Sequence, residues 1–179
     1  MILVIDDDKD FITVTKMILV REGYEVIAAR TITEINQIFA NLQNNPNHQI
    51  NLALLDLMMP DITGEEIFLR LRNHEYTADI PVIVFSAVNK IDKRVELLDL
   101  GVEDYLIKPC PIDELLARVA IHVQLGQLRK AKQEADVRIA SQARYLQAIN
   151  AIGNQASQHL ELEKMREIVT AGIIQRFEC

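Results

Sequence analysis

The sequence of 179 residues has few of the features that mark secreted, membrane-spanning or disulfide-stabilised chains. It contains only two cysteines, Cys110 and Cys179, and no tryptophan. Two cysteines argue against a disulfide scaffold and fit a reducing cytosol, which predicts a cytoplasmic protein. The Cys/His spacing of a tetrahedral zinc site is also missing. No apolar run approaches the roughly 18 residues of a membrane span, and no basic segment precedes Ile2–Ile5, so we expect neither a membrane helix nor a secretory leader.

The amino-acid composition changes near residue 120 and so divides the chain into two parts. Residues 1–120 hold 20 Asp and Glu against 11 Lys and Arg, whereas residues 121–179 hold 6 against 8. All five prolines and seven of the nine aromatic residues lie in the first part, and the second part carries eight Gln. This predicts a compact acidic domain followed by helix. The acidic charge argues against direct nucleic-acid binding by the first part.

Five short apolar runs alternate with segments of helical period in the first part. Runs that are apolar on both faces are typical of strands buried in a parallel sheet. Five alternations of strand and helix predict an α/β domain, with a five-stranded parallel, doubly wound sheet and helices on both faces. The Asn-rich stretch 41–51 predicts an exposed loop. The expected strands are 2–5, 24–28, 52–55, 82–85 and 105–107.

Polar residues follow four of these runs. Asp6-Asp7-Asp8 follows the first run, Asp56 the third, Ser86 the fourth and Lys108 the fifth. In a doubly wound sheet these ends meet at one edge, where ligands bind. Clustered carboxylates need a counter-charge, and Mg²⁺ with oxygen ligands supplies one. A central carboxylate can attack phosphorus to give an acyl phosphate, beside a lysine and a hydroxyl that hold phosphoryl oxygens. For Asp8 and Asp10 we favour the plainer role of helix caps.

The segments 3–8, 54–64, 84–87 and 104–109 together resemble the receiver domain of two-component response regulators, over residues 1 to about 122. The resemblance implies a flavodoxin-like fold with a cis Lys108–Pro109 bond. It implies that Asp56 is the phosphoacceptor and Lys108 the phosphate-binding lysine. Ser86 and Tyr105 would form the switch pair, with Tyr105 turning inward on phosphorylation. Mg²⁺ would be held by Asp7, Asp56 and the backbone carbonyl of Met58, with Asp6 acting through water.

A receiver would be a phosphoryl-accepting switch that is phosphorylated by a histidine kinase or a phosphotransfer protein. It would be no enzyme beyond catalysing its own phosphorylation and dephosphorylation. Met58 and Val88 would flank the path of the hydrolytic water, and both are apolar, which predicts a long-lived phosphoryl group.

Two alternatives to an active receiver stay open. One is a degenerate receiver that serves as a dimerisation module. The other is a Mg²⁺-dependent phosphohydrolase with an aspartate nucleophile, although such enzymes carry Asp-x-Asp and Met58 stands at the second position.

The second part predicts a long helix over residues 123–157. A repeat of 3.5 residues over 125–156 is apolar at seven of ten positions, which favours a parallel coiled coil in a homodimer over a helix packed on its own domain. We expect residues 158–179 to form a further helix, which resembles the opening of a GAF domain and would make the chain part of a larger protein. A stand-alone regulator with a dimerisation tail is the alternative. We expect His122 and His159 to be surface residues. The repeat positions are Leu125, Leu128, Lys132, Ala135, Ile139, Gln142, Leu146, Ile149, Gly153 and Ala156.

Overall fold

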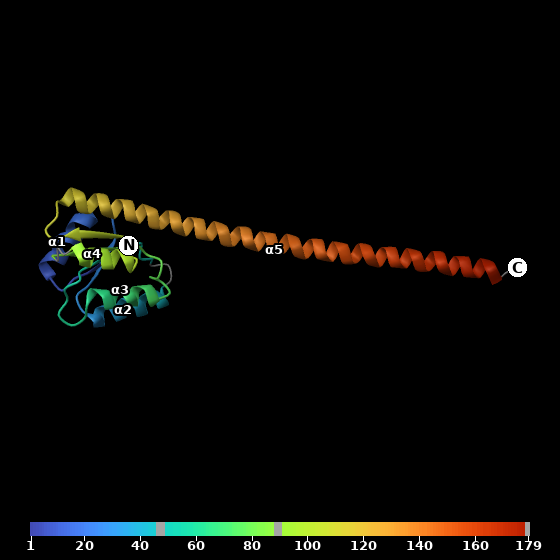
Figure 1. Ribbon diagram of the computed structural model, residues 1–179, viewed down its shortest axis with the longest axis horizontal. Helices are drawn as coiled ribbons and strands as arrows, with labels where there is room; N and C mark the ends of the chain where they lie inside the picture. The colour runs from blue at the N-terminus through green and yellow to red at the C-terminus, as the bar shows by residue number, and fades with distance from the viewer. Residues whose placement is uncertain (46–48, 88–90, 178–179) are drawn as a thin grey trace. The chain divides into compact units, whose positions relative to one another are not determined.

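The computed structural model describes the backbone of residues 1–45, 49–87 and 91–177 (Figure 1). Five parallel strands lie in the order β2-β1-β3-β4-β5, which confirms the predicted doubly wound sheet. The elements, in chain order, are β1 (Ile2–Ile5), α1 (Lys9–Arg21), β2 (Val26–Ala29), α2 (Ile32–Asn44), β3 (Leu52–Leu55), α3 (Gly64–Asn73), β4 (Val82–Ser86), α4 (Ile91–Asp99), β5 (Asp104–Ile107) and α5 (Ile112–Phe177).

The strands bury side chains on both faces of the sheet. Leu3 and Leu55 point into a layer that is completed by α2, α3 and α4. Val4 and Leu54 point into the opposite layer, which α1 and α5 complete. Covering both faces is what requires continuous apolar runs rather than alternation. The helix residues that fill the layers include Ile35, Ile67 and Leu97 on the first face and Leu19, Leu115 and Val119 on the second.

Side-chain caps begin α1, α2 and α3, and Thr31 is the cap of α2. The Asp8 carboxylate accepts hydrogen bonds from the N–H groups of Asp10 (2.8 Å) and Phe11 (3.1 Å), so Asp8 caps α1. Asp10 lies in the first turn of that helix and is not the cap. Thr63 and Glu66 form a reciprocal capping box at the start of α3. Such caps satisfy N–H groups that the helix itself leaves unpaired.

Helices extend further than the sequence pattern predicted in two places. α2 continues to Asn44, so the loop expected over 41–51 begins later, and residues 46–48 lie outside the described residues. α5 is a single helix from Ile112 to Phe177, where we expected a long helix over 123–157 and a second one over 158–179. No proline follows Pro111. A lone Gly153 weakens a helix by about 1 kcal/mol relative to Ala without ending it.

The chain divides into two compact units, Met1–Lys130 and Ala131 onward. The first unit extends past the expected boundary at residue 122 because α5 still touches the domain there. A Cβ atom on Gly126 would lie 3.1 Å from Pro81, so only glycine or a small adjustment lets the helix pass this close. The Lys130 ammonium donates a hydrogen bond to the side-chain oxygen of Gln49.

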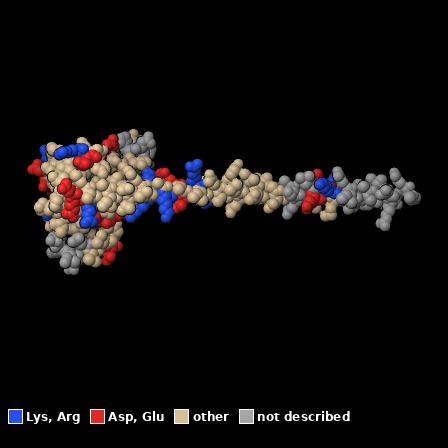
Figure 2. All heavy atoms as spheres, turned by 90° about the horizontal axis from the view of Figure 1, so that it is seen from above, with Lys and Arg blue, Asp and Glu red and all other residues tan. Residues whose placement is uncertain are grey.

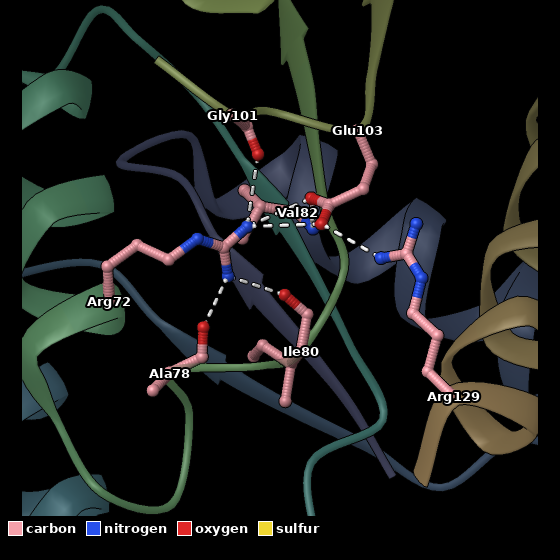
Figure 3. A network of polar contacts seen from close by, with 7 residues as sticks. All are labelled: Arg72, Ala78, Ile80, Val82, Gly101, Glu103 and Arg129. Atoms are coloured by element: carbon pink, nitrogen blue, oxygen red, sulfur yellow. Dashed lines mark hydrogen bonds and ion pairs between the residues drawn. The ribbon is translucent and has the colours of Figure 1, made fainter. Parts of the chain in front are cut away.

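A polar network around Arg72 joins α3, β4, the loop that precedes β5, and α5 (Figure 3). The Arg72 guanidinium lies 3.0 Å from the Glu103 carboxylate, which also accepts from the Val82 N–H at 2.7 Å. Arg129 of α5 approaches the same carboxylate at 3.5 Å. The Glu103 carboxylate thereby connects α3 on one face of the sheet with α5 on the other. Arg72 also donates to the backbone carbonyls of Ala78 (3.1 Å), Ile80 (2.6 Å) and Gly101 (3.3 Å).

Candidate functional site

Two adjacent parallel strands end in the two most buried carboxylates of the site. Ile5 of β1 is in register with Leu55 of β3, so Asp6 and Asp56 follow side by side. The Asp56 N–H donates to the carbonyl of Ile5 at 2.9 Å. Asp6 is 1% exposed and Asp56 is 8% exposed. The topology therefore places both acids at the carboxyl edge of the sheet, as the strand assignment predicted.

Asp7 completes a cluster of three carboxylates. Asp6, Asp7 and Asp56 each offer an oxygen, and these oxygens all lie within 4.8 Å of one another. Asp7 is the more accessible of the three. The structure thus brings together the side chains that the sequence analysis assigned to Mg²⁺. Carboxylate oxygens at this spacing are the donor set that hard divalent cations prefer.

Lys108 supplies the positive charge of the cluster. Its ammonium donates a hydrogen bond to Asp6 and another to Oδ2 of Asp56 at 2.7 Å. Its side chain is only 16% exposed. The Lys108 N–H donates to the carbonyl of Ser86 at 2.9 Å, and the Lys108–Pro109 bond is cis, as the resemblance implied. One lysine against three carboxylates leaves an excess of negative charge.

The environment of Asp6 opposes its ionisation. Burial raises the pKa of the Asp6 carboxyl above its usual value, while the hydrogen bonds from Lys108 and from the Asp8 N–H act in the other direction. Desolvation penalises the charged form, and a nearby cation favours it. An additional positive ion beside Asp6 would act as Lys108 does and favour the charged form of the carboxyl group.

The loop after β3 holds Asp56 in place. The Met58 N–H donates to Oδ1 of Asp56 at 3.1 Å, so both carboxylate oxygens have partners. Met58 pairs with Thr63 in a short antiparallel bridge, which folds the loop back to the start of α3. A Cβ atom on Gly64 would lie 2.6 Å from the Leu57 Cα, so the close approach of helix and loop requires glycine. The Met58 side chain is exposed.

Two aromatic rings flank the lysine, and the sequence analysis did not assign them to the site. The Lys108 Nζ lies 4.0 Å from the ring centre of Phe11 and 5.9 Å from that of Phe85. In the sequence, Phe11 stands at helical spacing and Phe85 ends the apolar run 82–85, and both patterns are typical of core residues. The available signal was their position, since Phe11 lies just after the cap of α1 and Phe85 directly precedes Ser86.

A family model described as "Response regulator receiver domain" matches residues 2–120 of the chain. The chain belongs to the response regulator receiver family. This confirms the resemblance over the first part, whereas the GAF-like opening near the C-terminus stays a prediction. Among the described residues of this receiver chain, no helix is both long enough and apolar enough to cross a membrane.

Curated relatives match the receiver over 118 residues, or 66% of this chain. The "DNA-binding dual master transcriptional regulator RpaA" of Synechocystis sp. is 37% identical, with 46% of its length covered. The "Phosphate regulon transcriptional regulatory protein PhoB" of Pseudomonas aeruginosa is 31% identical, with 49% covered. The chain thus spans about half the length of these relatives. A solved CheY-like receiver domain protein from Methanospirillum hungatei is 30% identical, with a TM-score of 0.58, over 72% of this chain and 96% of that one.

The two residues expected to form the receiver's switch pair are both buried. Ser86 ends β4 and is 0% exposed. Tyr105 of β5 is 5% exposed and packs in the layer of α2, α3 and α4. Tyr105 is therefore already buried in this structure, whereas the expected inward turn would begin from an exposed position. Val88, the second residue expected to flank the water path, lies outside the described residues.

His122 corrects a prediction. We expected a surface residue, but its side chain is 13% exposed and its Nε2 lies 3.1 Å from Oδ2 of Asp104. Arg118 approaches the same oxygen at 2.8 Å, because residues four apart on α5 share one helix face toward β5. Periodicity gave no sign of this, since the partner comes from a different element. The side chain of His159 lies outside the described residues.

Proposed function

We propose that this receiver is a phosphoryl-accepting signalling switch that is phosphorylated on Asp56. The observation that carries the proposal is the position of Asp56. Its Oδ2 lies 2.7 Å from the Lys108 ammonium, within a cluster whose other two carboxylates belong to Asp6 and Asp7. A nucleophilic oxygen, a fixed cation and a candidate metal site converge there, and these are the parts that phosphoryl transfer needs.

Mg²⁺ fits the donor set at this edge. Asp7, Asp56 and the backbone carbonyl of Met58 would hold it directly, and Asp6 would act through a water molecule. The excess of negative charge in the cluster favours an added cation. When bound, the ion would neutralise charge and orient phosphoryl oxygens.

The chain's own residues would carry out the transfer in one displacement. A carboxylate oxygen of Asp56 would attack the phosphorus of a partner's phosphohistidine. The new O–P bond would form as the N–P bond breaks, and the electron pair would return to the imidazole. Lys108 would hold a phosphoryl oxygen, and the Ser86 hydroxyl would donate a hydrogen bond to another. The partner would be a histidine kinase or a phosphotransfer protein.

Output would pass through α5. Leu115 and Val119 of α5 pack in the same buried layer as Phe85, which adjoins Ser86. A shift at the end of β4 would therefore reach α5 through direct packing. DNA binding, which the name of the Synechocystis relative states, is not carried over, because the shared region holds 20 acidic against 11 basic residues.

We also propose that two chains associate in parallel through residues 125–156. The apolar repeat residues from Leu125 to Ile149 are solvent-exposed, among them Leu128, Ile139 and Leu146. No Lys, Arg, Asp or Glu lies between Arg144 and Glu161 in the sequence, so charge would not oppose association there. Figure 2 shows part of the long helix without blue or red atoms, before the grey residues begin. Apolar residues at a 3.5-residue period gain stability by packing against a second copy.

Labelling with acetyl phosphate and Mg²⁺ tests the acceptor. Wild type should form an acid-stable, base-labile acyl phosphate, and Asp56→Asn should lose it entirely while remaining folded. Asp61→Asn is the matched control, since Asp61 is exposed on the same loop, and it should label normally. Chelation of Mg²⁺ should stop labelling of wild type.

Three outcomes would contradict this assignment. Undiminished labelling of Asp56→Asn would place the acceptor elsewhere. Failure of wild type to become labelled by either acetyl phosphate or a histidine kinase would favour a degenerate receiver. Continuous release of phosphate from a generic phosphate monoester, at a rate far above acyl-phosphate decay, would indicate a phosphohydrolase.

A further inference from the structure

The Lys108 ammonium lies against an aromatic surface as well as against carboxylates. The ring centre of Phe11 is 4.0 Å from Nζ, and the rings of Phe11 and Phe85 meet edge to face with centres 5.0 Å apart. Phe85 is 4% exposed, Phe11 is partly buried and the Lys108 side chain is 16% exposed, so the contact is partly shielded from water. The face of an aromatic ring carries partial negative charge and attracts a desolvated ammonium.

Three separate elements bring these groups together. The Asp8 cap accepts a hydrogen bond from the Phe11 N–H, which fixes the first turn of α1. Phe85 lies near the end of β4, and Lys108 follows β5, the neighbouring strand. Phe11 and Phe85 belong to the layer between the sheet, α1 and α5, so the ring surface rests on packed core.

We infer that Phe11, supported by Phe85, is a positioning residue for Lys108 in phosphoryl transfer, an inference that rests on the proposed function. The carboxylates that hold Nζ are Asp6 and Asp56. Both would also be engaged by the proposed reaction, because Asp56 would become bonded to phosphorus and Asp6 would help to hold the cation through a water molecule. Each engagement weakens the hold on the ammonium at the moment when its position matters.

An aromatic ring suits this task because of what it does not do. It cannot be phosphorylated, does not compete for Mg²⁺ and does not add to the repulsion among three carboxylates. A further carboxylate in its place would compete for Mg²⁺ and would add to the repulsion among the carboxylates. The contact between Phe11 and Lys108 therefore persists through the reaction and holds Nζ near the phosphoryl oxygens.

Replacing the ring while keeping an apolar side chain tests the inference. The phosphorylation rate at saturating Mg²⁺ and acetyl phosphate should fall about tenfold in Phe11→Leu, the factor expected for loss of a partly desolvated cation–ring contact. Phe11→Tyr, which keeps the ring face, should restore a rate near that of wild type. In a Lys108→Ala background, Phe11→Leu should have no further effect, because the two residues act as one unit.

A spectroscopic readout separates positioning from general stability. In NMR spectra, the Lys108 ε-protons of wild type and Phe11→Tyr should be shifted upfield by the ring current, and Phe11→Leu should lose the shift. Circular dichroism checks the fold, and Phe11→Met replaces Phe11→Leu if the latter does not fold.

Equal rates in Phe11→Leu and wild type would overturn the inference. So would an equal loss in the Lys108→Ala background, or the absence of the upfield shift in wild type. Failure of wild type itself to become labelled would instead refute the proposed function.

Discussion

At the residue scale, His74 makes folding stability depend on pH. His74 is the C-cap residue of α3. Its imidazole stacks on Phe39 of α2 with ring centres 4.2 Å apart, and its ring centre lies 5.8 Å from that of Tyr76. Neither ring nitrogen has a hydrogen-bond partner in the described part of the chain. Burial lowers the pKa of His74 from its ordinary value of 6.5, and the nearby Glu75 opposes this only in part. The neutral ring is therefore the form that the folded state accepts.

The sign of the pH effect follows from that lowered pKa. Well above pH 6.5 the imidazole is neutral in both states, and its contribution to stability is complete. As the pH falls from 6.5 through the lower folded-state pKa, the unfolded chain binds the proton more readily, so the free energy of unfolding falls. His74→Phe keeps the stacking and should flatten this decline between about pH 7.5 and pH 5.5 in chemical denaturation. Tyr76→Phe, which leaves the imidazole in place, should keep the wild-type pH slope, and equal slopes in wild type and His74→Phe would contradict the prediction.

The residues that the sequence identified at this scale differ in kind from those it missed. Asp6, Asp56, Ser86 and Lys108 were predictable because each follows a buried strand, and parallel strands end at one edge. Phe11 could not be assigned the same way, because an aromatic residue at helical spacing looks like core whether or not a cation lies over its ring. His122 was misplaced for a related reason, since its partner Asp104 comes from another element.

At the element scale, Arg72 holds the ends of several elements together. Its guanidinium serves three backbone carbonyls and Glu103, and its Cζ lies 4.7 Å from the ring centre of Phe68. A planar group with several fixed donors can do this, whereas an ammonium cannot match the geometry. Arg72→Lys should therefore lower the free energy of unfolding by about 1–3 kcal/mol, because partly buried acceptors lose their partners.

Arg70 offers a matched control for that measurement. It lies on the same helix two residues away and is exposed. Arg70→Lys should change the free energy of unfolding by no more than about 0.5 kcal/mol. Urea denaturation of the two variants beside wild type gives both values. Similar losses in both, or none in either, would mean that the network adds nothing to stability.

Element types were more predictable than element ends. Each of the five strands was expected within two residues of its observed bounds, because burial on both faces imposes an apolar run. The end of α2 at Asn44 and the unbroken course of α5 were not foreseen, since Asn and Gly tolerate helix without marking where it stops. The reach of the first unit to Lys130 depends on contacts with Pro81, Glu103 and Gln49, which no local pattern reveals.

At the scale of the whole molecule, the apolar repeat of α5 predicts a dimer that a substitution on the repeat should dissociate, whereas one on the opposite side of the helix should not. Ile139 and Val137 are almost equally exposed in the single chain, at 64% and 65%. Ile139 falls on the 3.5-residue repeat, and Val137, two residues earlier, falls on the opposite side of the helix. If a second chain covers the repeat, an aspartate at Ile139 is buried there, and one at Val137 stays in water. Ile139→Asp should therefore give a monomer in sedimentation experiments, and Val137→Asp should remain a dimer.

The same variants separate assembly from chemistry. The carboxylate cluster that forms the proposed phosphoryl site lies at the edge of β1 and β3, within the unit that ends at Lys130. Acyl-phosphate decay should therefore be equal in wild type, in Ile139→Asp and in a chain cut after Lys130, while the molar mass changes from dimer to monomer. Met58 beside the acceptor cannot orient water, so we expect that decay to be slow in all three. A monomeric wild type, or equal dissociation by both aspartates, would show that the repeat does not form the interface. Decay that depends on molar mass would show instead that the second chain reaches the site.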